Sequence, residues 1–386
     1  MARPGSRGIA TRMTAVAVIA VIACCAPVRI DPVGLPVAGE DAEGDLPREL
    51  LNRIEIPYAL DESLAAYAHQ ATLGTTSERS RAMALVYAIV GEQGLAIAYD
   101  ALANKTAKEV FRDGVGNCMG LSNLFIGMAR AVGLRVSYIE VLTIERYSEQ
   151  NGMVISSGHI TAVVLLGSEK MVIDFSPNPE RDYVDYRIID DREAIAHYYN
   201  NAAFLLKRQS ANPSPELLGR ELGLYRLALE VKPDFIRAEN NLGVALKRAG
   251  RTREAEALFQ KAIATDPTFG EAYANLAALQ YENGQFAAAI DLLKRATKRA
   301  RKSSYLHLNL GIFYFQQKSY ELAVAELRKA VSEMGEIASA HYYLACSFLA
   351  TGEHKKAERE LRRTLELEPG HARARERLKT LSATPL

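Results

Sequence analysis

One cysteine, one histidine and one aspartate follow each other in an order that suits nucleophilic catalysis by a thiol. Cys118 comes after a glycine-rich approach, Gly114-Val115-Gly116-Asn117, and opens an apolar helical pattern. A thiol at a helix N-terminus lies at the positive end of the helix dipole, which favours the thiolate. His159 and Asp174 lie on predicted strands further along the chain. A histidine beside a thiol can take its proton, and a carboxylate can orient the histidine.

The helix that carries Cys118 is predicted from apolar residues at three- and four-residue steps, ending near Gly133. These residues are Leu121, Leu124, Phe125, Met128 and Val132. The same pattern leaves a second interpretation open. A free cysteine often packs in an apolar helix as a small, inert hydrophobe.

Three strands are predicted after this helix, because the composition becomes β-branched and apolar. They span residues 134–143, 159–166 and 170–175, with a polar loop at 145–157. Helices upstream are predicted at 48–53, 64–70, 77–90 and 106–111. Helices followed by antiparallel strands indicate an α+β domain.

The last two predicted strands form a hairpin whose turn decides where the histidine and the aspartate meet. If residues 167–168 are the two turn residues, His159 faces Ser176 across the hairpin. Asp174 is then two positions away on the same face of the sheet. A turn longer by one residue would place His159 and Asp174 on opposite faces.

Three motifs resemble the core of the transglutaminase-like superfamily: Gly116-Asn117-Cys118-Met119-Gly120-Leu121, Gly158-His159 and Val172-Ile173-Asp174-Phe175. The resemblance spans about residues 77–177 and implies a papain-like α+β fold. It implies Cys118 as nucleophile, His159 as base and later acid, and Asp174 as the residue that orients His159. In bacteria such domains are more often assigned as cysteine peptidases or amidases than as cross-linking enzymes.

The chain departs from the family pattern in two places. Family members commonly carry an aromatic residue after the histidine, where this chain has Ile160-Thr161, and the chain contains no tryptophan. The backbone N–H of Cys118 can supply one donor of an oxyanion hole, and no second donor is identified. An inactive domain that keeps the fold therefore stays open as an alternative.

The second half of the sequence repeats at a constant spacing of 34 residues. Small residues recur at Gly243, Ala277, Gly311 and Ala345, and a second column recurs at Ala255, Ala289, Ala323 and Ala357. Small residues where two helices touch are typical of stacked helix-turn-helix units. The pattern is similar to the tetratricopeptide repeat (TPR). We expect four repeats over residues 236–381, a degenerate repeat or cap at 198–235, and the transglutaminase-like domain at 48–197.

The resemblance to this repeat implies a concave groove that binds a protein or peptide. An asparagine recurs every 34 residues, and an amide side chain can hydrogen-bond a peptide backbone without reading its sequence. The alternative is that these asparagines serve the packing of the repeat itself. The candidate peptide-binding residues are Asn241, Asn275, Asn309, Arg237, Lys247, Tyr281, Tyr305, Phe315 and Tyr342.

The N-terminus is typical of an exported protein. Basic residues precede an apolar run from Met13 to Ala23, and this run is too short to cross a bilayer as a stable helix. The segment Val21-Ile22-Ala23-Cys24 resembles the lipobox of bacterial lipoproteins, which implies a signal peptide at 1–23 and lipid attachment at Cys24. An ordinary cleaved signal is the alternative. Residues 24–47 are rich in proline, glycine and acids and predict a flexible linker.

Composition limits the remaining classes of function. With 47 basic and 46 acidic residues, the chain has no bulk charge for nucleic-acid binding. The four cysteines, at 24, 25, 118 and 346, have no zinc-site or disulfide spacing, so no metal and no cofactor are expected. We expect an envelope-tethered cysteine hydrolase, either a peptidase/amidase or an amide-transfer enzyme, with a protein-binding repeat domain. The alternative is an inactive scaffold lipoprotein that binds its partners through the TPR groove.

Overall fold

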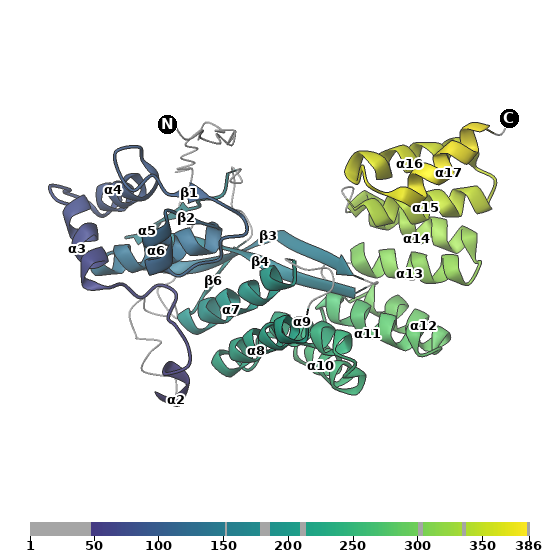
Figure 1. The fold of residues 1–386 in the computed structure, drawn as a ribbon, viewed down its shortest axis with the longest axis horizontal. Coiled ribbons are helices and arrows are strands. Elements are labelled where there is room, and N and C mark those ends of the chain that lie inside the picture. The colour runs from purple at the N-terminus through teal and green to yellow at the C-terminus, as the bar shows by residue number, and fades with distance from the viewer. Residues whose placement is uncertain are drawn as a thin grey trace, which may run out of the picture. The chain divides into compact units, whose positions relative to one another are not determined.

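The computed structural model describes residues 48–150, 153–177, 186–208, 214–299, 304–333 and 337–383. The predicted signal peptide, Cys24 and the linker at 24–47 lie outside the described residues. The chain divides into two compact units, Met1–Glu145 with Gly158–Tyr198 and Arg146–Ser157 with Tyr199–Leu386 (Figure 1).

Within residues 48–135, five short helices precede the main sheet of the first unit. They are α2 (Arg48–Leu51), α3 (Glu62–Ala71), α4 (Glu78–Val90), α5 (Ala107–Asp113) and α6 (Cys118–Ala131). Side chains fix several of their N-termini. Thr106 caps α5 in a capping box with Glu109, and Asn117 caps α6 by accepting the N–H of Gly120 at 2.9 Å. The helices predicted at 48–53, 64–70, 77–90 and 106–111 are confirmed.

The main sheet, in which residues 146–157 of β3 and β4 are assigned to the second unit, has four strands in the order β5-β4-β3-β6. These are β3 (Val136–Gln150), β4 (Met153–Leu166), β5 (Glu169–Ile173) and β6 (Tyr186–Ile189). The pairs β4–β5 and β3–β6 are antiparallel. A small parallel pair, β1 (Ala98–Tyr99) with β2 (Val115–Gly116), lies immediately before α6. The antiparallel α+β fold is confirmed.

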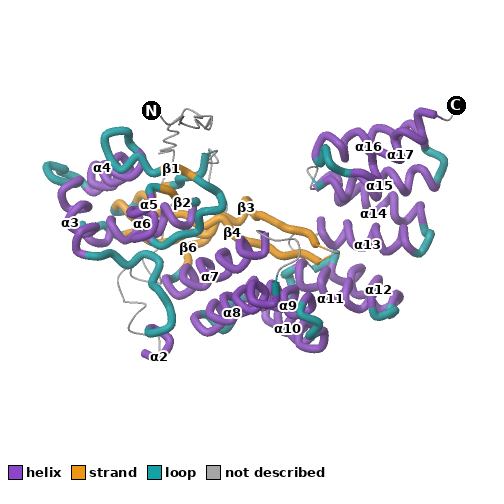
Figure 2. The backbone as a smooth tube through the Cα atoms, viewed as in Figure 1, coloured by secondary structure: helices purple, strands orange, loops and turns teal. Residues whose placement is uncertain are grey.

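Two details of the predicted sheet are wrong. The loop expected at 145–157 is strand on both sides, because β3 continues to Gln150 and β4 starts at Met153 (Figure 2). Polar residues there show no period that marks a strand, and backbone pairing between the two strands decides the conformation. The short strand β6 was not predicted. After β6 comes α7 (Asp191–Arg208), which begins six residues before the predicted end of the domain at residue 197.

The helix α6 is the centre of the first unit's core. Every residue from Cys118 to Ala129 is buried, so this helix is enclosed on all sides and does not bury a single stripe. Gly127 permits this close packing, because a Cβ atom there would lie 2.4 Å from the carbonyl oxygen of Tyr58. The α6 helix therefore has little freedom to move the thiol at its N-terminus.

The second unit consists mainly of antiparallel helix pairs. Its helices are α8 (Pro215–Val231), α9 (Ile236–Arg248), α10 (Thr252–Thr265), α11 (Gly270–Glu282), α12 (Phe286–Ala296), α13 (Ser304–Gln316), α14 (Tyr320–Glu333), α15 (Ala338–Ala350), α16 (His354–Leu367) and α17 (Ala372–Ala383). The small-residue columns lie where the paired helices meet. A Cβ atom on Gly243 would lie 2.6 Å from the ring of Phe259, and one on Gly311 would lie 2.5 Å from Leu327. The all-α repeat region is confirmed.

Among the helices that the structure describes, none combines the length and apolar character that a membrane span requires.

Candidate active site

Cys118 is the first residue of α6. The α5 helix ends at Gly114 in the left-handed conformation (φ 67°), and the chain passes through β2 to the cap residue Asn117. This places Cys118 at the positive end of the α6 dipole, as the sequence predicted. Cys118 is 7% exposed and is therefore a buried residue.

His159 and Asp174 meet across the β4–β5 hairpin. Leu166 pairs with Glu169, which confirms the two-residue turn at 167–168 and the predicted register. Nε2 of His159 lies 3.0 Å from Oδ2 of Asp174, and both side chains are almost fully buried. The geometry holds the imidazole by one nitrogen. The other nitrogen, Nδ1, is buried and has no hydrogen-bond partner among the residues that the structure describes.

Ser176 holds the aspartate in turn. Its backbone N–H donates to Oδ1 of Asp174 and its hydroxyl donates to Oδ2, both at 2.9 Å. The sequence placed Ser176 opposite His159 but assigned it no role. A serine two residues after an aspartate is common in turns, so the local sequence does not distinguish Ser176. Its register position opposite His159 was the only signal.

The electrostatics of the site couple the histidine to the cysteine. Burial alone lowers the pKa of His159, but the Asp174 carboxylate and the Cys118 sulfur outweigh burial and raise that pKa to about 10. An imidazole with this pKa is protonated at neutral pH. The arrangement therefore places a positive charge beside the sulfur of Cys118, the atom that would act as the nucleophile.

An ion pair fixes the far end of α6. Arg130 makes two bonds to Asp191 of α7, at 2.7 and 2.8 Å, and the Tyr58 hydroxyl donates to the same carboxylate at 3.0 Å. The Arg130 guanidinium also lies 4.9 Å from the centre of the Tyr58 ring. These contacts join three segments around the helix that carries the thiol.

In the second unit, the asparagines at 241 and 275 are buried and bond to other amides. Nδ2 of Asn241 donates to Asn200 at 2.9 Å, and Nδ2 of Asn275 donates to Asn240 at 2.7 Å. Asn309 is also buried, and its Nδ2 has no partner within the described part of the chain. The amide contacts show that the ladder serves packing between helices. They leave peptide binding by these residues untested.

The other groove candidates are also engaged with neighbouring side chains. Lys247 bonds Glu282 at 2.7 Å, and Tyr281 stacks on Phe313 with ring centres 4.1 Å apart. Arg377 donates to the Tyr342 hydroxyl at 3.3 Å. Arg237 is buried, Phe315 is half-buried, and the side chain of Tyr305 lies outside the described residues.

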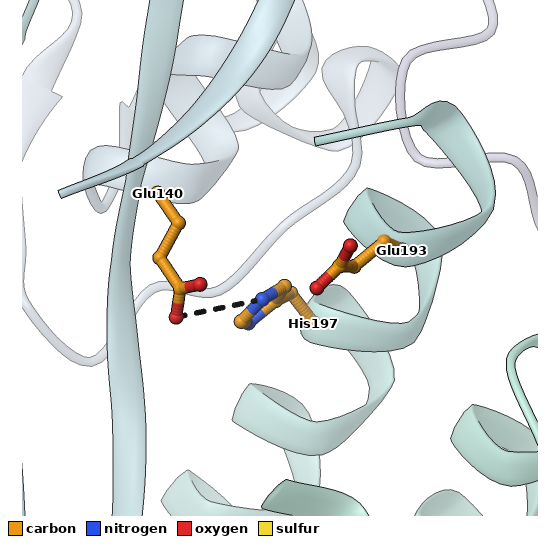
Figure 3. A group of neighbouring side chains, drawn as sticks. All are labelled: Glu140, Glu193 and His197. Atoms are coloured by element: carbon orange, nitrogen blue, oxygen red, sulfur yellow. Dashed lines mark ion pairs between the residues drawn. The ribbon is translucent and has the colours of Figure 1, made fainter. Parts of the chain in front are cut away.

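A further cluster offers metal-ligand types that the sequence analysis did not identify. Glu140 on β3 lies near Glu193 and His197 on α7, with the possible ligand atoms within 4.8 Å of one another (Figure 3). The Arg187 guanidinium, which Figure 3 does not draw, bonds Glu140 at 2.6 Å and also bonds Glu193. Because a cation already bridges the two carboxylates, the cluster is an ion-pair network between β3, β6 and α7.

Comparison with protein families distinguishes an N-terminal α+β region from a C-terminal repeat region. Residues 65–174 match the transglutaminase-like superfamily, and residues 225–310 and 304–333 match tetratricopeptide repeats. The chain thus contains a transglutaminase-like domain followed by tetratricopeptide repeats. A comparison with curated proteins gave no significant match.

Several solved structures are similar to the repeat region. YrrB, described as a TPR protein with an unusual peptide-binding site, is 21% identical, with 48% of this chain and 92% of that chain covered and a TM-score of 0.33. TTC0263, a TPR protein of Thermus thermophilus, is 19% identical. The match covers 49% of this chain and 100% of TTC0263, with a TM-score of 0.40. MamA of Desulfovibrio magneticus is 20% identical. The match covers 46% of this chain and 97% of the MamA chain, with a TM-score of 0.34.

Proposed function

We propose that the transglutaminase-like domain is a cysteine hydrolase that cleaves an amide through a thioester, and that the repeats bind its protein substrate or partner. The observation that carries the proposal is the hydrogen bond between His159 and Asp174 beside a thiol at a helix N-terminus. This combination supplies a nucleophile, a proton carrier and a group that orients the proton carrier.

The first half-reaction needs only these groups. The Cys118 thiolate attacks the amide carbonyl carbon, and the carbonyl oxygen becomes an oxyanion that the N–H of Cys118 can stabilise. The His159 imidazolium gives its proton to the amine nitrogen as the C–N bond breaks. The products are a free amine and a thioester on Cys118, with His159 neutral.

The second half-reaction decides between hydrolysis and transfer. Neutral His159 takes a proton from water, and the resulting hydroxide attacks the thioester to release a carboxylic acid and the Cys118 thiolate. An amine that attacks in place of water would form a new amide. Both outcomes use the same residues, and the low exposure of the thiol favours a small attacking group such as water.

The repeats supply the protein-binding part of the proposal. In repeat proteins, stacked helix pairs of this kind create extended concave binding surfaces. We assign the groove-lining candidates Asn309, Tyr281 and Tyr342 as the first residues to test. Asn309 is the strongest of these, because its buried amide nitrogen has no partner among the described side chains.

A thiol-reactive probe tests the enzyme proposal directly. Iodoacetamide is added to the purified chain in a Cys24→Ala/Cys25→Ala background, and labelling of Cys118 and Cys346 is followed by peptide mass spectrometry between pH 5 and 9. Cys346 is the internal control, because burial raises the pKa of its thiol. We expect Cys118 to react well below the pH at which Cys346 reacts, and to lose this reactivity in His159→Ala.

The alternative, an inactive scaffold, makes the opposite forecast. If Cys118 is labelled at the same pH as Cys346, or equally in His159→Ala, the catalytic proposal fails and the scaffold stands. If labelling follows the catalytic forecast, release of amine from a panel of peptide amides and cell-wall fragments identifies the substrate, with Cys118→Ser as the inactive control.

We also propose that the chain is exported and tethered to the bacterial envelope by a lipid on Cys24. The sequence pattern at 21–24 supports this, with the linker at 24–47 as a spacer. Cells fed with radiolabelled palmitate should label the wild-type chain and Cys25→Ala, and should not label Cys24→Ala. Equal labelling of Cys24→Ala would end the lipoprotein proposal and leave the enzyme proposal intact.

A further inference from the structure

The second unit contains a buried lysine whose amine is not paired. Lys207, near the end of α7, is 7% exposed, and its Nζ finds no hydrogen-bond partner within the described ranges. Burying an ammonium group without an anion costs several kcal/mol in general, so such groups are rare unless a ligand or partner supplies the negative charge.

The repeat geometry shows what is unusual about this position. The amide contact from Asn240 to Asn275 spans 35 residues, and the matching contact from Asn200 to Asn241 spans 41. The bond from Lys247 to Glu282 spans 35 residues, so its counterpart one unit earlier is Lys207 with Arg248 (248 − 207 = 41). Where the next repeat pairs a lysine with a glutamate, this unit places a lysine opposite an arginine.

The acid whose charge acts on Lys207, Glu221, is already occupied. Nη1 of Arg248 bonds both oxygens of Glu221, at 2.8 and 2.9 Å, and Glu221 is 2% exposed. Nη2 of Arg248 and the hydroxyl of the fully buried Tyr225 have no partner among the described residues. The cluster therefore contains three kinds of unused donor around one neutralised ion pair.

The charges of the cluster add to a single positive charge. Arg248 and Glu221 cancel, and Lys207 remains. Burial, together with the positive charge of Arg248, lowers the pKa of Lys207 to about 8. Arg248 keeps 15% of its side chain exposed, so this member of the cluster lies next to the surface of the unit.

We propose that Lys207 and Arg248 form a binding site for one carboxylate group, with the Tyr225 hydroxyl as a further donor. A carboxylate carries the one negative charge that the cluster lacks, and its oxygens can accept from the two unpartnered donors, Nζ of Lys207 and Nη2 of Arg248. The carboxylate belongs to a peptide chain end or to a small free acid. The site is independent of Cys118, so this inference and the hydrolase proposal stand or fall separately.

The test follows the Lys207 amine by NMR. The full chain is labelled with ¹³C-lysine, the Lys207 signal is assigned with Lys207→Arg, and its pKa is measured in sodium acetate and in sodium chloride of equal ionic strength. A bound carboxylate favours the ammonium form, so acetate should raise the pKa of Lys207 by about one unit, a tenfold change in its protonation equilibrium. Lys247, which already has Glu282, is the matched control and should not respond.

A second variant checks the role of the arginine. In Arg248→Met, Glu221 is released and becomes the partner of Lys207, so the pKa of Lys207 should rise without acetate and acetate should add nothing. Equal effects of acetate and chloride on wild type would overturn the proposal. An undiminished acetate effect in Arg248→Met would also overturn it.

The source of the carboxylate is resolved in the same titration. Acetyl-trialanine with a free C-terminal carboxylate is compared with its C-terminal amide. If the peptide with the free C-terminal carboxylate raises the pKa of Lys207 and its C-terminal amide does not, a peptide chain end is an acceptable ligand. A response to acetate with none to either peptide identifies a small free acid, and a failure of all three probes ends the proposal.

Discussion

Nε2 of His159 lies 3.0 Å from Oδ2 of Asp174, and their side chains are 2% and 1% exposed. A contact so well shielded from water is electrostatically strong, because little solvent screens it. It fixes the ring orientation and leaves Nδ1 as the nitrogen available to the thiol. The reactivity of Cys118 therefore depends on a carboxylate that belongs to a different element of the fold.

Removing that carboxylate should weaken the nucleophile. In Asp174→Asn, the pKa of His159 falls because its main stabilising partner is gone, and less imidazolium lies beside the Cys118 sulfur at pH 7. We expect the iodoacetamide reaction of Cys118 at pH 7 to slow about tenfold, and turnover of an identified substrate to fall by about 10²–10⁴. Ser176→Ala is the matched control. In this variant Asp174 still accepts the backbone N–H of residue 176, so the labelling rate of Cys118 should fall less than in Asp174→Asn. A labelling profile unchanged from wild type would contradict the role given to Asp174.

The same pair should make stability depend on pH. The pKa of His159 is raised from 6.5 to about 10 in the folded chain, so the folded state holds this proton more tightly than the unfolded state. Its contribution to the free energy of unfolding is therefore fully present below about pH 6.5 and is lost as the pH rises through about 10. Urea unfolding of wild type and Asp174→Asn should show a stability difference that shrinks from pH 6 to pH 10. A difference that grows over this range would contradict the sign of the shift.

The sequence was sufficient to predict the meeting of His159 and Asp174, because the turn at 167–168 sets the register of the hairpin. It was also sufficient to place Cys118 at a helix start, from the glycine-rich approach and the apolar period that follows. Local rules decide both features. The degree of burial was not accessible in this way, since α6 is enclosed by segments far apart in the sequence.

Other features depend on contacts that no local rule describes. The polar residues at 145–150 belong to β3, which is hydrogen-bonded to its neighbour β4 in the sheet. The 34-residue period identifies Asn241 and Asn275 but not their partners Asn200 and Asn240. Asn200 lies outside that period, because the step from α7 to α9 differs from the steps between later repeats.

The ion pair at the far end of α6 should contribute to the stability of the domain. In Arg130→Leu, Asp191 loses two charge-assisted bonds while its side chain stays only 19% exposed. We expect the free energy of unfolding to fall by about 2–4 kcal/mol, measured by urea unfolding at pH 7. Arg112→Leu is the control, since Arg112 pairs with Asp113 at the surface, and we expect no measurable change there. Equal effects of the two substitutions would contradict a structural role for Arg130.

Steric contact between repeat helices gives the last prediction. A Cβ atom at Gly243 would lie 2.6 Å from the Phe259 ring, so Gly243→Ala forces α9 and α10 apart and should cost about 1–3 kcal/mol in unfolding free energy. At Gly219 in α8, nothing lies within 4 Å of the added Cβ, so Gly219→Ala should instead raise stability by about 0.5–1 kcal/mol through helix propensity. Urea unfolding measures both.

A double-mutant cycle isolates the contact, because Phe259→Leu removes the ring edge that the new methyl group meets. If the contact is the cause, Gly243→Ala costs less in the Phe259→Leu background than in wild type; additive costs would show that another contact limits this position.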